Sequence, residues 1–138
     1  MPKVTVTCPR IPVSIGELVD KITILEIKGA RLCGDKRDHA SRELQLLQAE
    51  LAATAAAIEP VLLQELREVN LALWQIEDEI RDHERRQDFG ARFIDLARAV
   101  YITNDRRAAI KGTINSRCGS VIIEVKSYHQ YTDAMDLG

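Results

Sequence analysis

A stripe of residues on one face of a long helix, predicted over residues 89–117, changes from apolar to polar halfway along. Its members recur every three or four positions and are Phe93, Ala97, Val100, Asn104, Arg107, Lys111 and Asn115. Two cations and two amides on one face suit an anionic group such as a phosphate or a carboxylate. Asn104, Arg107 and Lys111 are therefore candidate ligand-binding residues. Alternatively, the cations only favour the dipole at the helix C-terminus, on a helix end that extends past the core.

A second polar stripe lies on the helix predicted over residues 61–86. Its members are Asn70, Trp74, Glu77, Arg81 and Glu84. Glu77 and Arg81 have the spacing of an i, i+4 ion pair, and Trp74 is the only tryptophan of the chain. If this stripe faces the first one, Glu77 can pair with Arg107, and Trp74, Glu77 and Arg81 belong to the same ligand site. The alternative is a structural network of ion pairs.

Glu26 interrupts the apolar face of the first helix, predicted over residues 14–32. It lies close in azimuth to Val19 and Ile22, so its carboxylate costs free energy unless it has a partner. Two interpretations remain open at this stage. Glu26 forms a salt bridge to another helix, or it faces a ligand.

Four carboxylates suggest an alternative, metal-dependent chemistry. Glu17 and Asp20 form an ExxD pair, and Glu77 and Asp78 belong to the second polar region. Carboxylates are preferred ligands of Mg²⁺, but acidic pairs at this spacing are common in helices. Our first hypothesis requires no metal or other cofactor. The histidines and cysteines show no zinc-ligand spacing, and no common catalytic motif is present.

Long helices must position these stripes, and the sequence predicts four. Their ranges are 14–32, 39–58, 61–86 and 89–117. Ser14 and Glu17 form a capping box at the start of the first helix, and Gly119 is a stop signal after the last. The first helix has apolar residues on two sides, so we expect it to sit centrally and to be contacted from two directions.

The third predicted helix carries a seam typical of coiled coils. Apolar residues recur at alternating spacings of four and three and are Leu62, Leu66, Val69, Leu73, Ile76 and Ile80. We expect the helices over 39–58 and 61–86 to form a long antiparallel hairpin. Because a second copy often covers such a seam, we also expect a homodimer.

Two short segments have the pattern of β-strands. Residues 3–8 form a β-branched run with Val4, Val6 and Cys8 on one side and Lys3, Thr5 and Thr7 on the other, and residues 121–125 read VIIEV. We expect them to pair as a small terminal two-stranded ribbon that lies on the helices, since an isolated ribbon is marginally stable. The remainder of the C-terminal segment is expected to be irregular.

Length and composition indicate a single, mainly α domain over residues 1–138, resembling a four-helix bundle. The chain is 46% hydrophobic and 29% charged, with a net charge of −2, which argues against a nucleic-acid-binding protein. It has no apolar run long enough to span a membrane and no apolar signal-peptide segment at its start. Three widely spaced cysteines suggest reduced thiols in a cytoplasmic protein.

Several longer strings resemble a family of small uncharacterised bacterial proteins, a domain of unknown function. They are SIGELVDKITILEIK (14–28), NLALWQIEDEIR (70–81), FIDLARAVYITNDRRAAIK (93–111) and GSVIIEVKSY (119–128). Similar segments occur attached to glycosyltransferase-like or tetratricopeptide-containing proteins. The resemblance implies a bacterial source and a link to surface-glycan metabolism, but no activity. Gly112 departs from the family's pattern, in which a charged or long residue is expected.

Two hypotheses for function follow from these observations. The first is a non-enzymatic binding or interaction module that recognises an anionic small molecule or a partner protein. The second is a small metal-dependent enzyme that acts on a nucleotide or sugar nucleotide, with Glu17, Asp20, Glu77 or Asp78 as metal ligands. Dependence on Mg²⁺ distinguishes them.

Overall fold

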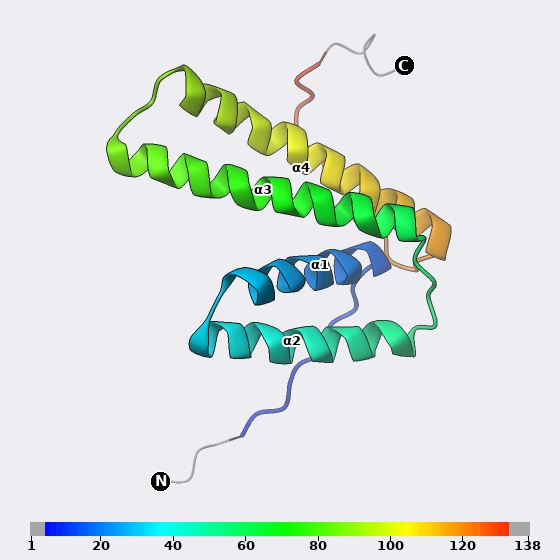
Figure 1. The fold of residues 1–138 in the computed structure, drawn as a ribbon. Coiled ribbons are helices and arrows are strands. Elements are labelled where there is room, and N and C mark those ends of the chain that lie inside the picture. The colour runs from blue at the N-terminus through cyan, green and yellow to red at the C-terminus, as the bar shows by residue number, and fades with distance from the viewer. Residues whose placement is uncertain (1–4, 133–138) are drawn as a thin grey trace.

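The computed structural model describes residues 5–132 and contains four α-helices in this range (Figure 1). They are α1 (Ile15–Arg31), α2 (Gly34–Ala53), α3 (Pro60–Arg86) and α4 (Ala91–Cys118). The ends of α1, α3 and α4 lie within two residues of the predicted ones. Among the described residues, no helix is long and apolar enough to cross a membrane.

The observed helix ends agree with the predicted ones where a capping residue marks the end. The Ser14 hydroxyl accepts a hydrogen bond from the backbone N–H of Glu17 at 3.0 Å and so caps α1. Gly119 ends α4 in the left-handed region, with φ +64°. Helix α2 is displaced from its predicted range at both ends. Thr54 ends it early, and Ala55 then takes a φ of +59°.

Helix α1 lies at the centre of the molecule, as predicted. It packs against α2 on one side and against both α3 and α4 on the other. Val19 of α1 joins Leu62 and Leu66 of α3 and Ile114 of α4 in the buried core. The apolar residues on two sides of α1 therefore have the two sets of partners that the pattern requires.

The predicted hairpin of the second and third helices is wrong. Helix α2 pairs with α1, while α3 forms a long antiparallel hairpin with α4 (Figure 1). The seam on α3 exists, but residues of α1 and α4 cover it, at Val19 and Ile114 for example. A heptad pattern specifies an apolar face, and any helix with a matching face can cover it.

The predicted β-ribbon is also absent from the described residues. Residues 5–8 and 121–125 are irregular, and Val6 and Val121 are 81% and 98% exposed. Residues 3 and 4 lie outside the described part. Residues 121–125 stay beside the start of α1, where Glu124 contacts Ser14, so they are anchored through one side chain and not through a strand partner. The irregular C-terminal segment is confirmed up to residue 132, where the Tyr131 ring packs 5.1 Å from the Tyr101 ring.

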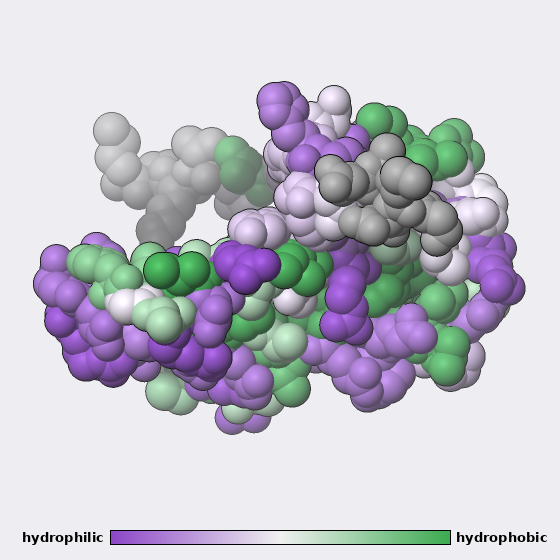
Figure 2. Space-filling model, turned by 90° about the horizontal axis from the view of Figure 1, so that it is seen from above, coloured by the Kyte–Doolittle hydropathy of each residue, from purple (hydrophilic) through white to green (hydrophobic). Residues whose placement is uncertain are grey.

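The α3–α4 hairpin extends beyond the end of α1 (Figure 1). Seen from above, hydrophilic residues cover most of the hairpin's far end, with smaller hydrophobic patches among them (Figure 2). The part of the hairpin that contains the start of α3 and the end of α4 packs on α1, whereas the part near the α3–α4 turn extends past α1 (Figure 1). The candidate site lies beside the part that packs on α1.

Candidate functional site

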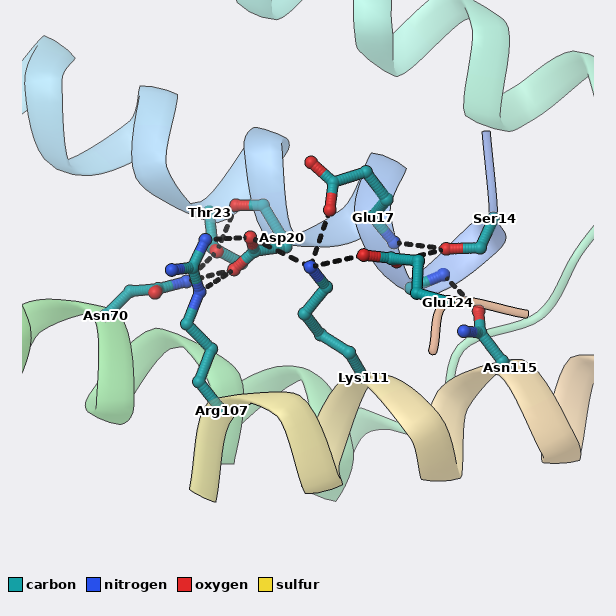
Figure 3. A network of polar contacts seen from close by, with 10 residues as sticks. Ser14, Glu17, Asp20, Thr23, Asn70, Arg107, Lys111, Asn115 and Glu124 are labelled. Carbon is teal, nitrogen blue, oxygen red and sulfur yellow. Dashed lines mark hydrogen bonds and ion pairs between the residues drawn. The ribbon is translucent and has the colours of Figure 1, made fainter. Parts of the chain in front are cut away.

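The cationic face of α4 meets an acidic face of α1 in a buried network (Figure 3). Arg107 donates from Nε to Asp20 Oδ1 at 2.9 Å and from Nη2 to Asp20 Oδ2. One turn further along α4, Lys111 Nζ donates to Glu17 Oε2 at 2.5 Å. Asp20 is completely buried. The two predicted cations thus bind two of the residues proposed as metal ligands.

Helix α3 completes the environment of Asp20. The Asn70 amide donates from Nδ2 to Asp20 Oδ1 and to Thr23 Oγ1, each at 2.8 Å. Thr23 donates in turn to the backbone carbonyl of Asp20 at 2.7 Å. Residues of α1, α3 and α4 therefore together fix the position of the buried Asp20 carboxylate.

The same network reaches the start of α1 and the C-terminal segment. Ser14 donates to Glu124 Oε1 at 2.7 Å, and Lys111 Nζ lies 3.4 Å from Glu124 Oε2. The Gly16 backbone N–H donates to Asn115 Oδ1 at 2.6 Å. A Cβ atom at Gly16 would lie 2.6 Å from the Lys111 carbonyl oxygen, so glycine permits the close approach of α1 to α4.

The network stabilises the ionised forms of Asp20, Lys111 and Glu124. Burial alone would raise the pKa of Asp20, but hydrogen bonds from Arg107 and Asn70, with the charges of Arg107 and Lys111, lower that pKa below its ordinary 3.8. Burial alone would lower the pKa of Lys111, yet Glu17 and the neighbouring carboxylates raise it above 10.5. The pKa of Glu124 is lowered below 4.5, because the Ser14 hydrogen bond and Lys111 outweigh burial.

An open pocket of about 460 Å³ lies beside this network, between α1 at Ile24 and the α3–α4 hairpin. Its apolar wall consists of Ile24, Leu73 and Trp74. Its polar lining residues are Asn70, Glu77, Asp78, Arg81, Asn104 and Arg107. The two polar stripes of the sequence therefore do meet, on α3 and α4.

Arg107 belongs to both the network and the pocket. Asp20 binds its Nε and Nη2, whereas its Nη1 makes no hydrogen bond with any other described residue. Glu77 pairs with Arg81 at 2.7 Å, as the i, i+4 spacing predicts, so the considered pair of Glu77 with Arg107 does not form. The side chains of Asp78 and Asn104 make no hydrogen bond or ion pair within the described part of the chain, although both line the pocket.

Two predicted ligand-binding residues lie elsewhere. Lys111 is buried among Glu17, Asp20 and Glu124 and does not line the pocket. Glu26 forms a salt bridge with Arg67 of α3 at 3.0 Å, which matches the structural interpretation of its position. Trp74, Glu77, Arg81, Asn104 and Arg107 are brought together at the pocket.

The carboxylates considered for Mg²⁺ do not converge. Glu17 and Asp20 are engaged by Lys111 and Arg107, while Glu77 and Asp78 lie on α3 at the pocket. Residues 5–132 contain no group of three or more carboxylate, histidine or cysteine side chains arranged to hold a metal ion.

Sequence reasoning missed the roles of Ser14 and Glu124 in the network. Glu124 had a visible signal, since it is the one charged residue in the run VIIEV. Asn70 was placed on the second stripe but not among the candidate residues. Its partner Asp20 lies 50 positions away in the chain, and helical spacing carries no information on such a contact.

Comparisons with known proteins give a family and no function. Neither a curated protein nor a solved structure matches the chain. One family model matches residues 10–135, which include every residue of the network and the pocket. The chain therefore belongs to DUF6165, a family of unknown function.

Proposed function

We propose that the protein is a binding module for a small molecule with an anionic group, which Arg107 holds in the pocket between α1, α3 and α4. One observation carries the proposal. The buried carboxylate of Asp20 binds two nitrogens of Arg107, while the third nitrogen, Nη1, has no partner in the described chain although Arg107 lines the pocket.

This arrangement prepares Arg107 for a ligand. Arginine side chains are flexible, and fixing one during binding costs conformational entropy. Asp20 has already fixed the guanidinium, and Asn70 and Thr23 hold Asp20. A carboxylate or phosphate oxygen at Nη1 would therefore gain a charge-assisted hydrogen bond at a low entropic cost.

The pocket walls suit a ligand of limited size. Trp74, Leu73 and Ile24 offer apolar contact area, and Asn104 offers an amide without a partner in the described chain. Small-molecule sites combine apolar contact surface with convergent polar groups, and this pocket has three apolar lining residues beside six polar ones. Trp74 gives it a rigid flat surface.

The positions of the carboxylates favour a binding module over a metal-dependent enzyme. Glu17 and Asp20 would have to release Lys111 and Arg107 before they could hold Mg²⁺. Such an exchange would leave the partly buried Arg107 without its carboxylate and Lys111 with Glu124 alone, at a high cost in stability. The homodimer, the partner protein, the cytoplasmic location and the link to bacterial surface glycans stay predictions.

Trp74 allows a direct test, because the only tryptophan of the chain lines the pocket. Its fluorescence would be titrated with carboxylates, phosphate monoesters, nucleotides and sugar nucleotides, with and without Mg²⁺. We expect saturable changes with at least one anion class and no requirement for Mg²⁺. Thermal unfolding gives a second readout, since a ligand at a hundred times its Kd adds about 2.7 kcal/mol of stability.

The informative variant is Arg107→Lys, which keeps the charge beside Asp20 but removes the planar guanidinium and its Nη1. Asn104→Ala is a second variant, because the Asn104 side chain lines the pocket and makes no hydrogen bond with another described residue. Arg92→Gln is the control, as Arg92 lies on α4 and pairs with Glu79 away from the pocket. Binding that survives both pocket variants, or binding that strictly requires Mg²⁺, would contradict the proposal.

A further inference from the structure

The charges around the pocket do not favour a highly anionic ligand. Among the lining residues, Arg81 and Arg107 supply two positive charges and Glu77 and Asp78 two negative ones, while the buried Asp20 beside Arg107 lies 3.7 Å from Lys111. Each arginine already pairs with a carboxylate, and Asp78 remains without a partner among the described residues. A ligand with several negative charges would be attracted at Arg107 and repelled by the rest of the pocket.

The polar groups also have an order along the groove. Asn70, Trp74 and Asp78 follow one another at intervals of four residues, on one face of α3. Arg107 is level with Asn70, because both bind Asp20. From Asn70 to Asp78 the helix rises by about 12 Å, with Trp74 halfway.

The antiparallel course of α4 places Asn104 near the middle of this groove. Ion pairs at both ends of the hairpin support the alignment, with Arg92 on Glu79 at one end and Arg117 on Glu59 at the other. One turn from Arg107, Asn104 is therefore level with Trp74. The groove presents Arg107 at one end, a flat apolar wall and an amide in its middle, and at the other end Asp78 beside the Glu77–Arg81 ion pair, a net charge of −1.

We infer that the ligand is an elongated zwitterion. Its single anionic group binds Arg107, its body lies against Trp74, and its protonated amine reaches Asp78. This inference rests on the proposed function, since it extends the same site by a second anchoring point. It separates the ligand from polyphosphates, which lack the amine and carry excess negative charge. It also separates it from α-amino acids, which are too short to span from Arg107 to Asp78.

A series of ω-amino acids tests the spacing and the charge together. Trp74 fluorescence of the full chain would be titrated with 4-aminobutanoate, 6-aminohexanoate and 8-aminooctanoate, each against the carboxylate of equal length without the amine. Pyrophosphate serves as the polyphosphate probe. We expect the amine to strengthen binding by about two- to five-fold, as for an exposed ion pair, only once the chain is long enough to reach Asp78.

Asp78→Asn should abolish the advantage of the amine, while the plain carboxylates should bind at least as tightly as to the parent, because the substitution removes a repelling charge from the pocket. Glu79→Gln is the matched control, because Glu79 is the next residue on α3, does not line the pocket and should not affect the advantage. The advantage should also disappear at high salt, which screens an exposed carboxylate.

The outcomes separate this inference from the proposed function. Arg107-dependent binding of carboxylates without any gain from the amine, or tighter binding of pyrophosphate, would overturn the zwitterion and keep the anion site. A gain that persists in Asp78→Asn would also overturn it. If neither these probes nor the phosphate monoesters, nucleotides and sugar nucleotides alter Trp74 fluorescence in an Arg107-dependent way, the proposed function itself fails.

Discussion

Two neighbouring regions of this protein use the same residue types for different ends. In the buried network, Asp20, Lys111 and Asn115 each have close partners on another element. In the pocket next to it, Asp78 and Asn104 have none among the described residues. Both regions contain carboxylates, cations and amides. They differ in whether these groups already have hydrogen-bonding partners within the protein.

Arg107 connects the two regions and shows what the difference means. Its contacts with Asp20 belong to the stability of the α1–α4 packing, whereas its Nη1 belongs to the pocket. A charged residue on a helix is therefore not assigned to structure or to binding by its type. Whether such a residue can bind a ligand depends on how many of its hydrogen-bond donors already have partners within the protein.

The difference between the buried network and the pocket predicts that the largest loss of stability occurs on substitution of Asp20. Asp20→Asn leaves Arg107 and Lys111 partly buried without their common carboxylate, which should destabilise the protein by about 3–5 kcal/mol. Urea unfolding followed by circular dichroism measures the change. Asp78→Asn, in the pocket, should stay within about 0.5 kcal/mol of the parent. Equal effects at the two positions would show that the network is not structurally distinct from the pocket.

Acid should destabilise the network by a smaller amount, since it protonates the same carboxylates only in part. The folded-state pKa values of Asp20 and Glu124 lie below their ordinary 3.8 and 4.5. Their stabilising contribution is therefore complete above about pH 4.5 and declines as the pH falls toward the lowered values. Unfolding free energies measured from pH 6 to pH 3 should decline less steeply in Glu124→Gln than in the parent, and Glu79→Gln should show no comparable change.

The close contact of α1 with α4 gives a matched pair of glycine substitutions. In Gly16→Ala the new Cβ would lie 2.6 Å from the Lys111 carbonyl oxygen and 2.9 Å from Asn115 Oδ1, so we expect a loss of about 1–3 kcal/mol. In Gly112→Ala nothing lies within 4 Å of the new Cβ, and the helix should gain about 0.5–1 kcal/mol. Thermal unfolding distinguishes the two signs. A neutral Gly16→Ala would show that the helices separate at little cost.

The smallest effect is expected for the exposed ion pair at the pocket rim. Arg81→Gln removes the 2.7 Å contact with Glu77, but the Arg81 side chain is 73% exposed. Such pairs contribute about 0.2–1 kcal/mol, so the unfolding midpoint should hardly move. A double-mutant cycle with Glu77→Gln measures the pair itself. A coupling above about 1 kcal/mol would place this pair with the buried network and would weaken the comparison.

Much of the local structure was predictable from the sequence. Ser14 and Gly119 are local signals for the start and the end of a helix. Helix α1 begins directly after Ser14, and α4 ends directly before Gly119. The two polar stripes were also predictable, because helical periodicity determines which residues share a face. Five of the seven candidate ligand-binding residues consequently lie at one pocket.

The partners of these faces were not predictable in the same way. The seam on α3 suggested α2 as its cover, and α1 and α4 cover it instead. Asp20 and Arg107 were assigned to opposite hypotheses, one as a metal ligand and one as an anion-binding residue, yet they form a pair across 87 positions of the chain.

By itself, the sequence determined the four helices, their two-sided or one-sided apolar patterns and the polar stripes on α3 and α4. Only the tertiary structure decided that Lys111 is buried, that Glu26 meets Arg67, and that Arg107 keeps one nitrogen for the pocket. The physical reason is that periodicity acts within a helix, over a few residues. The choice of a partner depends on how complete faces pack and on which charges must be neutralised once they are buried.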